Sequence, residues 1–203
     1  MVFVSLLFFA VVCVMKYLIV GHSWVRRLQP FRNLLPNGAV LLGVGGATFR
    51  SAIPLLHSFV ERPETATDPP FAVFVLLGGN EIHRARTYAD ADAVIQGCID
   101  FCKCIRDLLP GVLIAVSQVE DRYHVGPGDI VDDHRRLGNR YNTWLNKWQR
   151  KDGLVTIKGS RVLSCPEVFL VDGVHLNELG NSRLCQRLTY SIWKMWGLKQ
   201  DKA

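Results

Sequence analysis

The stretch YLIVGHS, residues 17–23, begins with an apolar run and ends in a glycine followed by two polar residues. Short apolar runs of this kind recur along the chain, and segments with helical periodicity separate them. Continuous apolar strands joined through helices are typical of a parallel sheet that is covered on both faces. We therefore predict an α/β fold, a three-layer α/β/α sandwich whose five-stranded parallel sheet is formed by residues 17–20, 39–44, 71–77, 112–116 and 154–157.

The segments between the runs carry apolar residues at helical spacing. We predict helices with buried faces that contain Val94 to Leu108, Leu137 to Trp148, and Leu184 to Met195, the last with Asn177 as its N-cap. Cys98 and Cys102 lie one turn apart on the first of these faces, so they are interpreted as buried core residues rather than metal ligands. The aromatic residues of the second face are likewise interpreted as core rather than as a platform for stacked bases.

Composition places the chain among ordinary globular proteins. It has 203 residues, 49% hydrophobic and 21% charged, which suits one domain with a sizeable core. Its six cysteines show no zinc-binding spacing, and free cysteines favour a reducing, intracellular compartment, although membrane-anchored and secreted locations stay open. The net charge of +6 is compatible with an anionic partner such as nucleic acid, but the basic residues are spread along the chain.

The N-terminal segment has three interpretations. Residues 1–15 are uncharged and apolar, and they run directly into the first predicted strand. They could be a membrane anchor, a signal sequence without a clear basic region or cleavage site, or an extension outside the domain, which we favour. The predicted organisation is an extension over 1–15, a catalytic domain over 16–198 and a polar tail over 199–203.

Polar or glycine-rich residues follow the predicted strands or precede the last helix. Ser23 follows the first strand, Gly45-Gly46 the second and Asn80 the third, and Asp172 and His175 stand before the last helix. Because the carboxyl ends of parallel strands meet at one edge of the sheet, these residues are expected to converge there.

Ser23, His175 and Asp172 have the chemistry of a catalytic triad. A serine hydroxyl needs an imidazole to take its proton, so His175 is the candidate base and Asp172 the residue that orients it. The three-residue spacing of Asp172 and His175 places both on one loop, and Val25 stands where a G-x-S-x-G elbow needs glycine. Both features disfavour an α/β-hydrolase, and the absence of G-x-G-x-x-G disfavours a nucleotide-binding fold.

Acyl transfer also needs donors for the oxyanion. The candidates are the main-chain N–H groups of Ser23 and Gly46, with Gly45 as the second choice for the glycine, and the side-chain amide of Asn80.

Together the four blocks Gly21-His22-Ser23, Gly45-Gly46, Gly79-Asn80-Glu81 and Asp172-x-x-His175 resemble the SGNH (GDSL-type) serine hydrolase superfamily. The resemblance spans roughly residues 16–198, and a looser similarity extends to esterase-like domains encoded in some animal retroelements. It implies a flavodoxin-like sandwich that hydrolyses small carboxylic esters or thioesters through an acyl-enzyme, without a metal or cofactor. Two residues depart from the family pattern, His22 before the nucleophile and Glu81 after the block-three asparagine, and neither is a triad or oxyanion group.

A second hypothesis comes from another functional class. Some proteins of this fold have lost their chemistry and bind RNA, so the chain could be an inactive module that binds RNA or another anion through its basic surface. The retention of Ser23, Asp172, His175 and Asn80 favours the enzyme. In either case the loop 118–133, which carries Asp121, Arg122, Tyr123 and His124, is expected to overhang the cleft and to take part in substrate choice.

Overall fold

The computed structural model describes residues 15–122, 131–152, 154–158, 163 and 165–201. Its central element is a parallel sheet of five strands in the order β2-β1-β3-β4-β5, which is the flavodoxin-like order. Each strand lies in an apolar run predicted from the sequence. The strands are β1 (Tyr17–Gly21), β2 (Ala39–Gly43), β3 (Ala72–Leu76), β4 (Leu113–Ser117) and β5 (Val155–Ile157).

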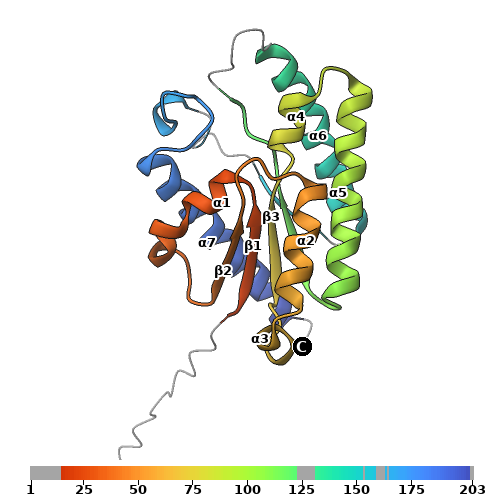
Figure 1. Ribbon diagram of the computed structural model, residues 1–203, viewed down its shortest axis with the longest axis vertical. Coiled ribbons are helices and arrows are strands. Elements are labelled where there is room, and N and C mark those ends of the chain that lie inside the picture. Colours follow the sequence, from red (N-terminus) through yellow and green to blue (C-terminus); the bar gives the residue numbers. More distant parts are fainter. Residues whose placement is uncertain (1–14, 123–130, 153, 159–162, 164, 202–203) are drawn as a thin grey trace, which may run out of the picture.

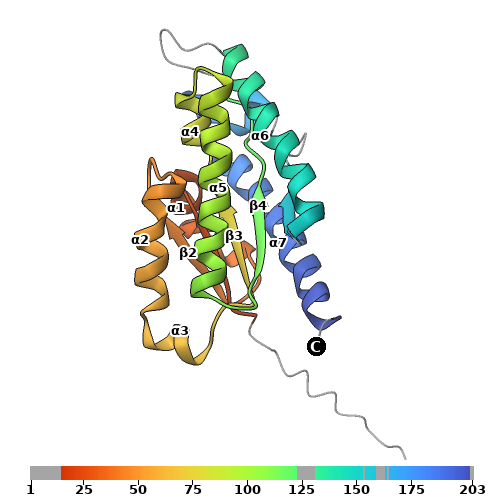
Figure 2. The ribbon, with the colours of Figure 1, turned by 90° about the vertical axis from the view of Figure 1, so that its right-hand side faces the viewer.

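Helices cover both faces of this sheet, as Figures 1 and 2 show. The α2, α5 and α6 helices pack on one face, and α1, η1 and α7 pack on the other. The helical elements are α1 (Ser23–Arg27), η1 (Gln29–Leu34), α2 (Phe49–Val60), α3 (Pro63–Thr67), α4 (Gly79–Arg84), α5 (Tyr88–Leu108), α6 (Val131–Asp152), η2 (Pro166–Val168) and α7 (Glu178–Gln200). The predicted α/β/α sandwich is confirmed.

Alternate residues of the strands enter two separate cores. On β1, Leu18 and Val20 pack under α2 and α5, whereas Tyr17 and Ile19 pack under α1 and α7. Every residue of β1 and β3 is buried. This two-sided burial explains why the strands are continuous apolar runs rather than alternating ones.

The helix interpretations are also confirmed. Cys98 and Cys102 are buried, and the cysteines among the described residues are free. Tyr141 is buried, while Trp144 and Trp148 stack on each other with ring centroids 4.7 Å apart and pack against the same core. Asn177 caps α7, since its side chain accepts a hydrogen bond from the Gly180 N–H.

The ends of the domain differ slightly from the prediction. Met15 is buried in the core below α1 and α7, and the rest of the predicted extension lies outside the described residues. The α7 helix continues to Gln200, two residues into the segment predicted as a tail. Within the described part of the chain, no helix has an apolar stretch long enough to cross a membrane.

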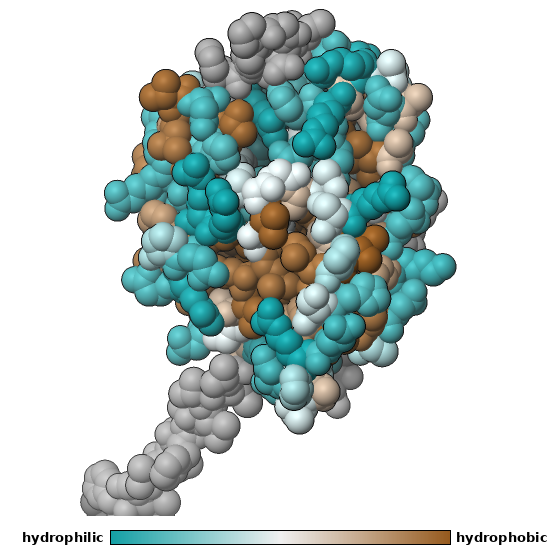
Figure 3. Space-filling view, in the orientation of Figure 1, coloured by the Kyte–Doolittle hydropathy of each residue, from teal (hydrophilic) through white to brown (hydrophobic). Residues whose placement is uncertain are grey.

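The edge strand β2 marks the less covered side of the sheet. Its residues from Val40 to Gly43 are only half-buried, and Val44 after it is 44% exposed. Figure 3 shows apolar side chains gathered near the middle of the face on which β2 lies, surrounded by hydrophilic ones. The carboxyl ends of β1, β2 and β3 lead into the turns that carry the candidate site.

Candidate active site

The turn after β1 places Ser23 at the start of a helix. Gly21 ends the strand in a position without space for a side chain, because a Cβ there would lie 2.6 Å from both the Leu76 carbonyl oxygen and Val25 Cγ2. His22 is the N-cap of α1, and its Nδ1 accepts a hydrogen bond from the Trp24 N–H at 3.3 Å. Ser23 is the first residue of α1 and is only 8% exposed. The candidate nucleophile therefore stands on a closely packed strand-to-helix turn.

Asp172 and His175 face each other on the loop before α7. Asp172 Oδ2 lies 2.7 Å from His175 Nδ1, and Asp172 Oδ1 accepts hydrogen bonds from the N–H groups of Val174 and His175 at 2.9 and 2.8 Å. Partial burial favours the protonated acid, but these hydrogen bonds and the His175 ring outweigh it and lower the pKa of Asp172 to about 2. A carboxylate at this place accepts the Nδ1–H of the imidazole and leaves Nε2 as the proton acceptor.

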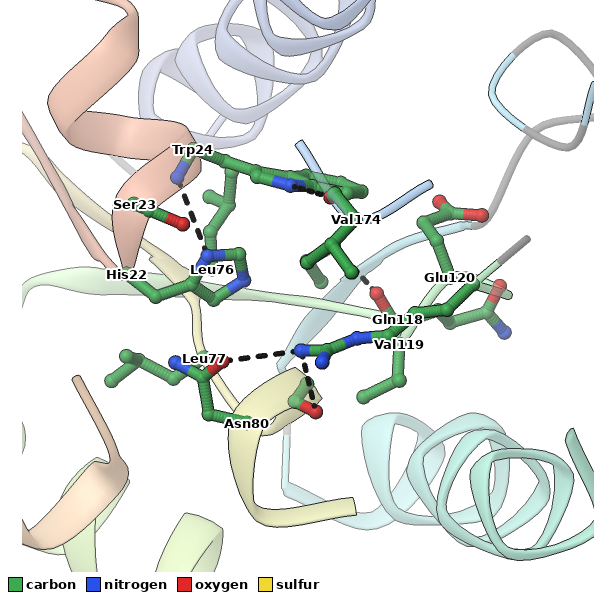
Figure 4. Close-up of a pocket in the computed structure, with 13 residues that line it drawn as sticks. His22, Ser23, Trp24, Leu76, Leu77, Asn80, Gln118, Val119, Glu120 and Val174 are labelled. Carbon is green, nitrogen blue, oxygen red and sulfur yellow. Dashed lines mark hydrogen bonds between the residues drawn. The ribbon is translucent and has the colours of Figure 1, made fainter. Parts of the chain in front are cut away.

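A hydrogen bond joins this loop to the turn that carries Ser23. The indole Nε1–H of Trp24 donates a hydrogen bond to the Val174 carbonyl at 2.9 Å, which Figure 4 shows. His175 lies near enough to His22 that its charge contributes to the lowered pKa of His22. The bond between Trp24 and Val174 places the loop of Asp172 and His175 beside the turn of Ser23 at one end of the sheet, although about 150 residues separate the two segments in the chain.

The predicted oxyanion residues lie on the two adjacent turns. Gly45 and Gly46 are exposed in the turn after β2, and Gly46 has a φ of +74°, which favours glycine. Gly45 lies against the guanidinium of Arg26, whose Nη1 would be 3.6 Å from a Cβ at this position. Asn80 is bonded to the same turn, because its Nδ2 donates to the Ala47 carbonyl at 2.9 Å.

A cavity opens at this end of the sheet (Figure 4). It brings Ser23 and Asn80 together, and it does not include Gly46, Asp172 or His175 in its wall. Gly46 precedes Ala47, whose carbonyl accepts a hydrogen bond from Asn80, and Asp172 and His175 stand on either side of Val174, which lines the cavity. The lining consists of His22, Ser23, Trp24, Leu76, Leu77, Gly79, Asn80, Ser117, Gln118, Val119, Glu120, Arg122 and Val174.

The imidazole of His22 forms part of the cavity wall, and its low pKa favours the uncharged ring at neutral pH. Burial lowers the pKa of His22 to about 4, and the electrostatic effects of the Arg122 guanidinium and of the His175 imidazole act in the same direction. Because Nδ1 accepts the Trp24 N–H, the proton of the neutral ring lies on Nε2. His22 thus caps α1, as an acidic residue could, without placing a negative charge beside Ser23.

Glu81, the other departure from the family pattern, has a structural role. Its Oε1 accepts the main-chain N–H of Phe49 at 2.6 Å, so it holds the start of α2 against α4. Burial raises the pKa of this carboxyl group, although its hydrogen bonds oppose the change. The turn after β2 is therefore tied to α4 through both Asn80 and Glu81.

The segment after β4 supplies polar groups whose partners were not predicted from the sequence. Arg122 Nη2 donates to the Gly79 carbonyl at 3.2 Å and to Asn80 Oδ1 at 3.1 Å. Glu120 pairs with Arg187 of α7 at 2.8 Å, with side chains that are 6% and 12% exposed. Arg122 belongs to the loop predicted to overhang the cleft. Its position just after the fourth strand is the sequence feature that could have indicated a place in the site. Tyr123 and His124 lie outside the described residues.

Comparisons with known proteins agree with this architecture. The model of the GDSL-like lipase/acylhydrolase family matches residues 19–183. No curated protein matches the chain in sequence.

Several solved structures have a similar fold. A putative acylhydrolase from Bacteroides fragilis has 16% identity and a TM-score of 0.69, over 89% of this chain and 87% of its own. The esterase EstA from Pseudoalteromonas sp. has 15% identity and a TM-score of 0.62, over 90% and 98%. Axe2, an acetylxylan esterase from Geobacillus stearothermophilus, has 13% identity and a TM-score of 0.63, over 88% and 94%.

Proposed function

The chain belongs to the GDSL-like lipase/acylhydrolase family and is an ester hydrolase of the SGNH type, and from this membership we propose that Ser23 is its nucleophile, His175 its base and Asp172 the residue that orients the base. The substrate in this proposal is a carboxylic ester or thioester of small size. The reaction passes through an acyl-enzyme on Ser23.

The observation that carries the proposal is the 2.7 Å contact between Asp172 Oδ2 and His175 Nδ1, on a loop bonded to the turn of Ser23. A carboxylate on Nδ1 stabilises the imidazolium that forms when Nε2 takes a proton. The remaining requirement is that Nε2 reaches the hydroxyl of Ser23 when the substrate is bound.

The proposed reaction uses the triad side chains and one water molecule. Ser23 Oγ attacks the ester carbonyl while its proton passes to Nε2 of His175, and the carbonyl oxygen becomes an oxyanion. The tetrahedral intermediate collapses, the bond to the alcohol or thiol breaks, and the leaving group takes the proton from His175. A water molecule, deprotonated by the same imidazole, then attacks the acyl-enzyme, the bond to Ser23 Oγ breaks, and Oγ takes the proton back from His175 as the acid leaves.

Three donors are proposed for the oxyanion. They are the main-chain N–H groups of Ser23 and Gly46, with Gly45 as the alternative glycine, and one N–H of Asn80 Nδ2. Asn80 Nδ2 has two protons, and the hydrogen bond to the Ala47 carbonyl occupies one of them. Losing one such donor typically lowers kcat by about 10²–10³-fold.

The test is covalent labelling with a fluorophosphonate probe, together with hydrolysis of p-nitrophenyl acetate. We expect the probe to modify Ser23, and Ser23→Ala and His175→Ala to lower kcat by up to about 10⁶-fold. Ser191→Ala is the matched control, because Ser191 is also 8% exposed but lies on α7. Equal rates for the wild type and Ser23→Ala would refute the proposed mechanism.

The alternative of an RNA-binding module is less well supported. A groove between α5 and α6 carries Arg136, Arg140 and Lys147, which could face an anionic polymer. However, Arg140 pairs with Asp92 at 2.7 Å and Arg136 with Asp133 at 2.9 Å, so acidic groups already balance part of this charge. If phosphate contacts dominate, the binding of RNA to the protein in a filter assay should fall steeply as the salt concentration rises. If no RNA binding is measured at low salt, this alternative is removed.

A further inference from the structure

Arg122 donates hydrogen bonds to the turn that carries Asn80, and these bonds indicate how the amide of Asn80 is oriented. The inference drawn from them rests on the proposed function. Arg122 Nη2 donates to the side-chain oxygen of Asn80 at 3.1 Å and to the Gly79 carbonyl at 3.2 Å. The two acceptors belong to consecutive residues at the start of α4. The guanidinium is therefore bound to the turn that presents the candidate oxyanion amide.

An arginine can only donate hydrogen bonds, and this decides which end of the amide faces it. With Oδ1 toward Arg122, the Nδ2 group of Asn80 points to the turn after β2, where it donates to the Ala47 carbonyl at 2.9 Å. The flipped amide would set its NH₂ group against the guanidinium and its oxygen against the carbonyl of Ala47. Both contacts would then be repulsive, so the two partners together select one orientation.

The Ala47 carbonyl restrains the amide at its nitrogen only. A single hydrogen bond leaves the amide plane free to rotate about that contact, and the second N–H then changes direction. The contact at Oδ1 removes this freedom. It also places a positive charge next to the amide oxygen, which polarises the group and strengthens its N–H donors.

We propose that Arg122 is a positioning residue that holds the side-chain amide of Asn80 with its free N–H directed at the oxyanion. Arg122 acts through Asn80 and does not itself touch the reacting atoms. The segment after β4 thus contributes to the donor set that the turns after β1, β2 and β3 provide.

The first test compares kinetics of single and double variants with p-nitrophenyl acetate. Arg122→Met should lower kcat about 10- to 100-fold, less than the roughly 10²–10³-fold expected for Asn80→Ala, and KM should change less than about threefold. Arg122→Lys, which keeps one donor and the charge, should recover part of the loss. In the Asn80→Ala background, Arg122→Met should cause no further loss beyond about twofold, because its target is gone.

Arg86→Met is the control for removing an arginine near α4. Arg86 donates to the His83 and Ala85 carbonyls at 2.9 and 3.2 Å, at the other end of this helix. The kcat of the Arg86→Met variant should equal that of the wild type. A full additional loss in the Asn80→Ala background, or a rise in KM with unchanged kcat, would overturn the proposal and assign Arg122 to substrate binding or to stability.

The second test does not depend on activity, so it separates this proposal from the proposed function. In protein labelled with ¹⁵N-asparagine, the two Nδ2 protons of Asn80 should give separate, shifted resonances, identified by their loss in Asn80→Ala. Arg122→Met should move them toward the positions of a free amide, and Arg86→Met should leave them in place. Unchanged resonances in Arg122→Met would overturn the positioning role, whereas equal hydrolysis by the wild type and Ser23→Ala would refute only the triad.

Discussion

The turn of Ser23 and the loop of Asp172 and His175 serve one proposed reaction, but they are built in opposite ways. Ser23 is 8% exposed and follows a strand whose residues are all buried. The side chains of Asp172 and His175 are 47% and 27% exposed. The first region is held by the core, and the second by hydrogen bonds within four residues and by the bond between Trp24 and Val174.

Because of this difference, substitutions in the two regions should affect different properties, stability in one region and activity in the other. A change in the buried turn disturbs close packing, so it should lower the free energy of unfolding. A change in the exposed loop leaves the core intact, so it should mainly lower kcat. Substitutions in the two regions test this comparison, and the one with the largest expected effect comes first.

Asp172→Asn should have the largest effect, on activity. The amide cannot hold the imidazole in the required tautomer, and we expect kcat to fall about 10⁴-fold, or about 5.5 kcal/mol of transition-state stabilisation. Because the carboxylate is about half exposed, the free energy of unfolding at pH 7 should change by less than about 1 kcal/mol. Steady-state kinetics and urea unfolding measure the two quantities, and Glu178→Gln, at an exposed carboxylate early in α7, is the control.

His22 should cause the next largest effect, on the pH dependence of stability. Its pKa is about 4 in the folded protein and 6.5 when exposed, so between these values the unfolded chain binds a proton that the folded protein does not. Stability should therefore fall as the pH drops from about 6.5 to 4, by about 3 kcal/mol, and this contribution should be constant below pH 4.

His22→Asn tests this assignment, because its side-chain oxygen can still accept the Trp24 N–H while the group no longer titrates. Urea unfolding from pH 7.5 to 4 should show a shallower loss in this variant than in the wild type. His57→Asn, on the exposed surface of α2, controls for the loss of one histidine. An unchanged slope in His22→Asn would mean that another group causes the pH dependence.

A pair of glycine substitutions compares the backbones of the two regions directly. Gly21→Ala places a Cβ 2.6 Å from the Leu76 carbonyl oxygen, so we expect a loss of about 2–3 kcal/mol in the free energy of unfolding. Gly173, a buried residue between the partly exposed Asp172 and His175, has a φ of +60°, and Gly173→Ala should cost about 1 kcal/mol through that conformation. Chemical denaturation at pH 7 checks both, and a larger loss in Gly173→Ala would contradict the comparison.

Substitution of Glu81 should have the smallest effect among these four sets of variants. Glu81→Gln keeps an acceptor for the Phe49 N–H, and the neutral amide suits a site where burial already raises the pKa of the carboxyl group. We expect a change within about 0.5 kcal/mol for Glu81→Gln and a loss of about 1 kcal/mol for Glu81→Ala. A large loss in Glu81→Gln would show that the charge, rather than the hydrogen bond, is required.

Much of the fold was predictable because local patterns and tertiary burial agree. The run Tyr17–Val20 is apolar at every position because both faces of β1 are covered, and Asn177 is a good N-cap in any helix. The candidate residues Ser23, Asn80 and Asp172 could be located because active sites of parallel sheets form where strands end. Strand ends differ from the predicted ones by at most one residue, since the hydrogen-bond ladder, rather than hydrophobicity, ends a strand.

Arg122, Glu81 and His22 show what a local pattern does not contain. Arg122 reaches Asn80 only because β4 lies next to β3 in the sheet, although 42 residues separate the two side chains in the chain. Glu81 meets the start of α2 across a similar separation. The low pKa of His22 depends on burial and on charges supplied by two other loops.

The sequence by itself determined the strands, the three longest helices, the family and the residues proposed for the reaction, because periodicity, caps and strand-end motifs are properties of neighbouring residues. The tertiary structure alone decided that Ser23 is buried, that the side chains of Asp172 and His175 are partly exposed, and which polar groups contact the amide of Asn80. Burial, electrostatic shifts and hydrogen bonds between distant segments depend on three-dimensional distance, which spacing along the chain does not specify.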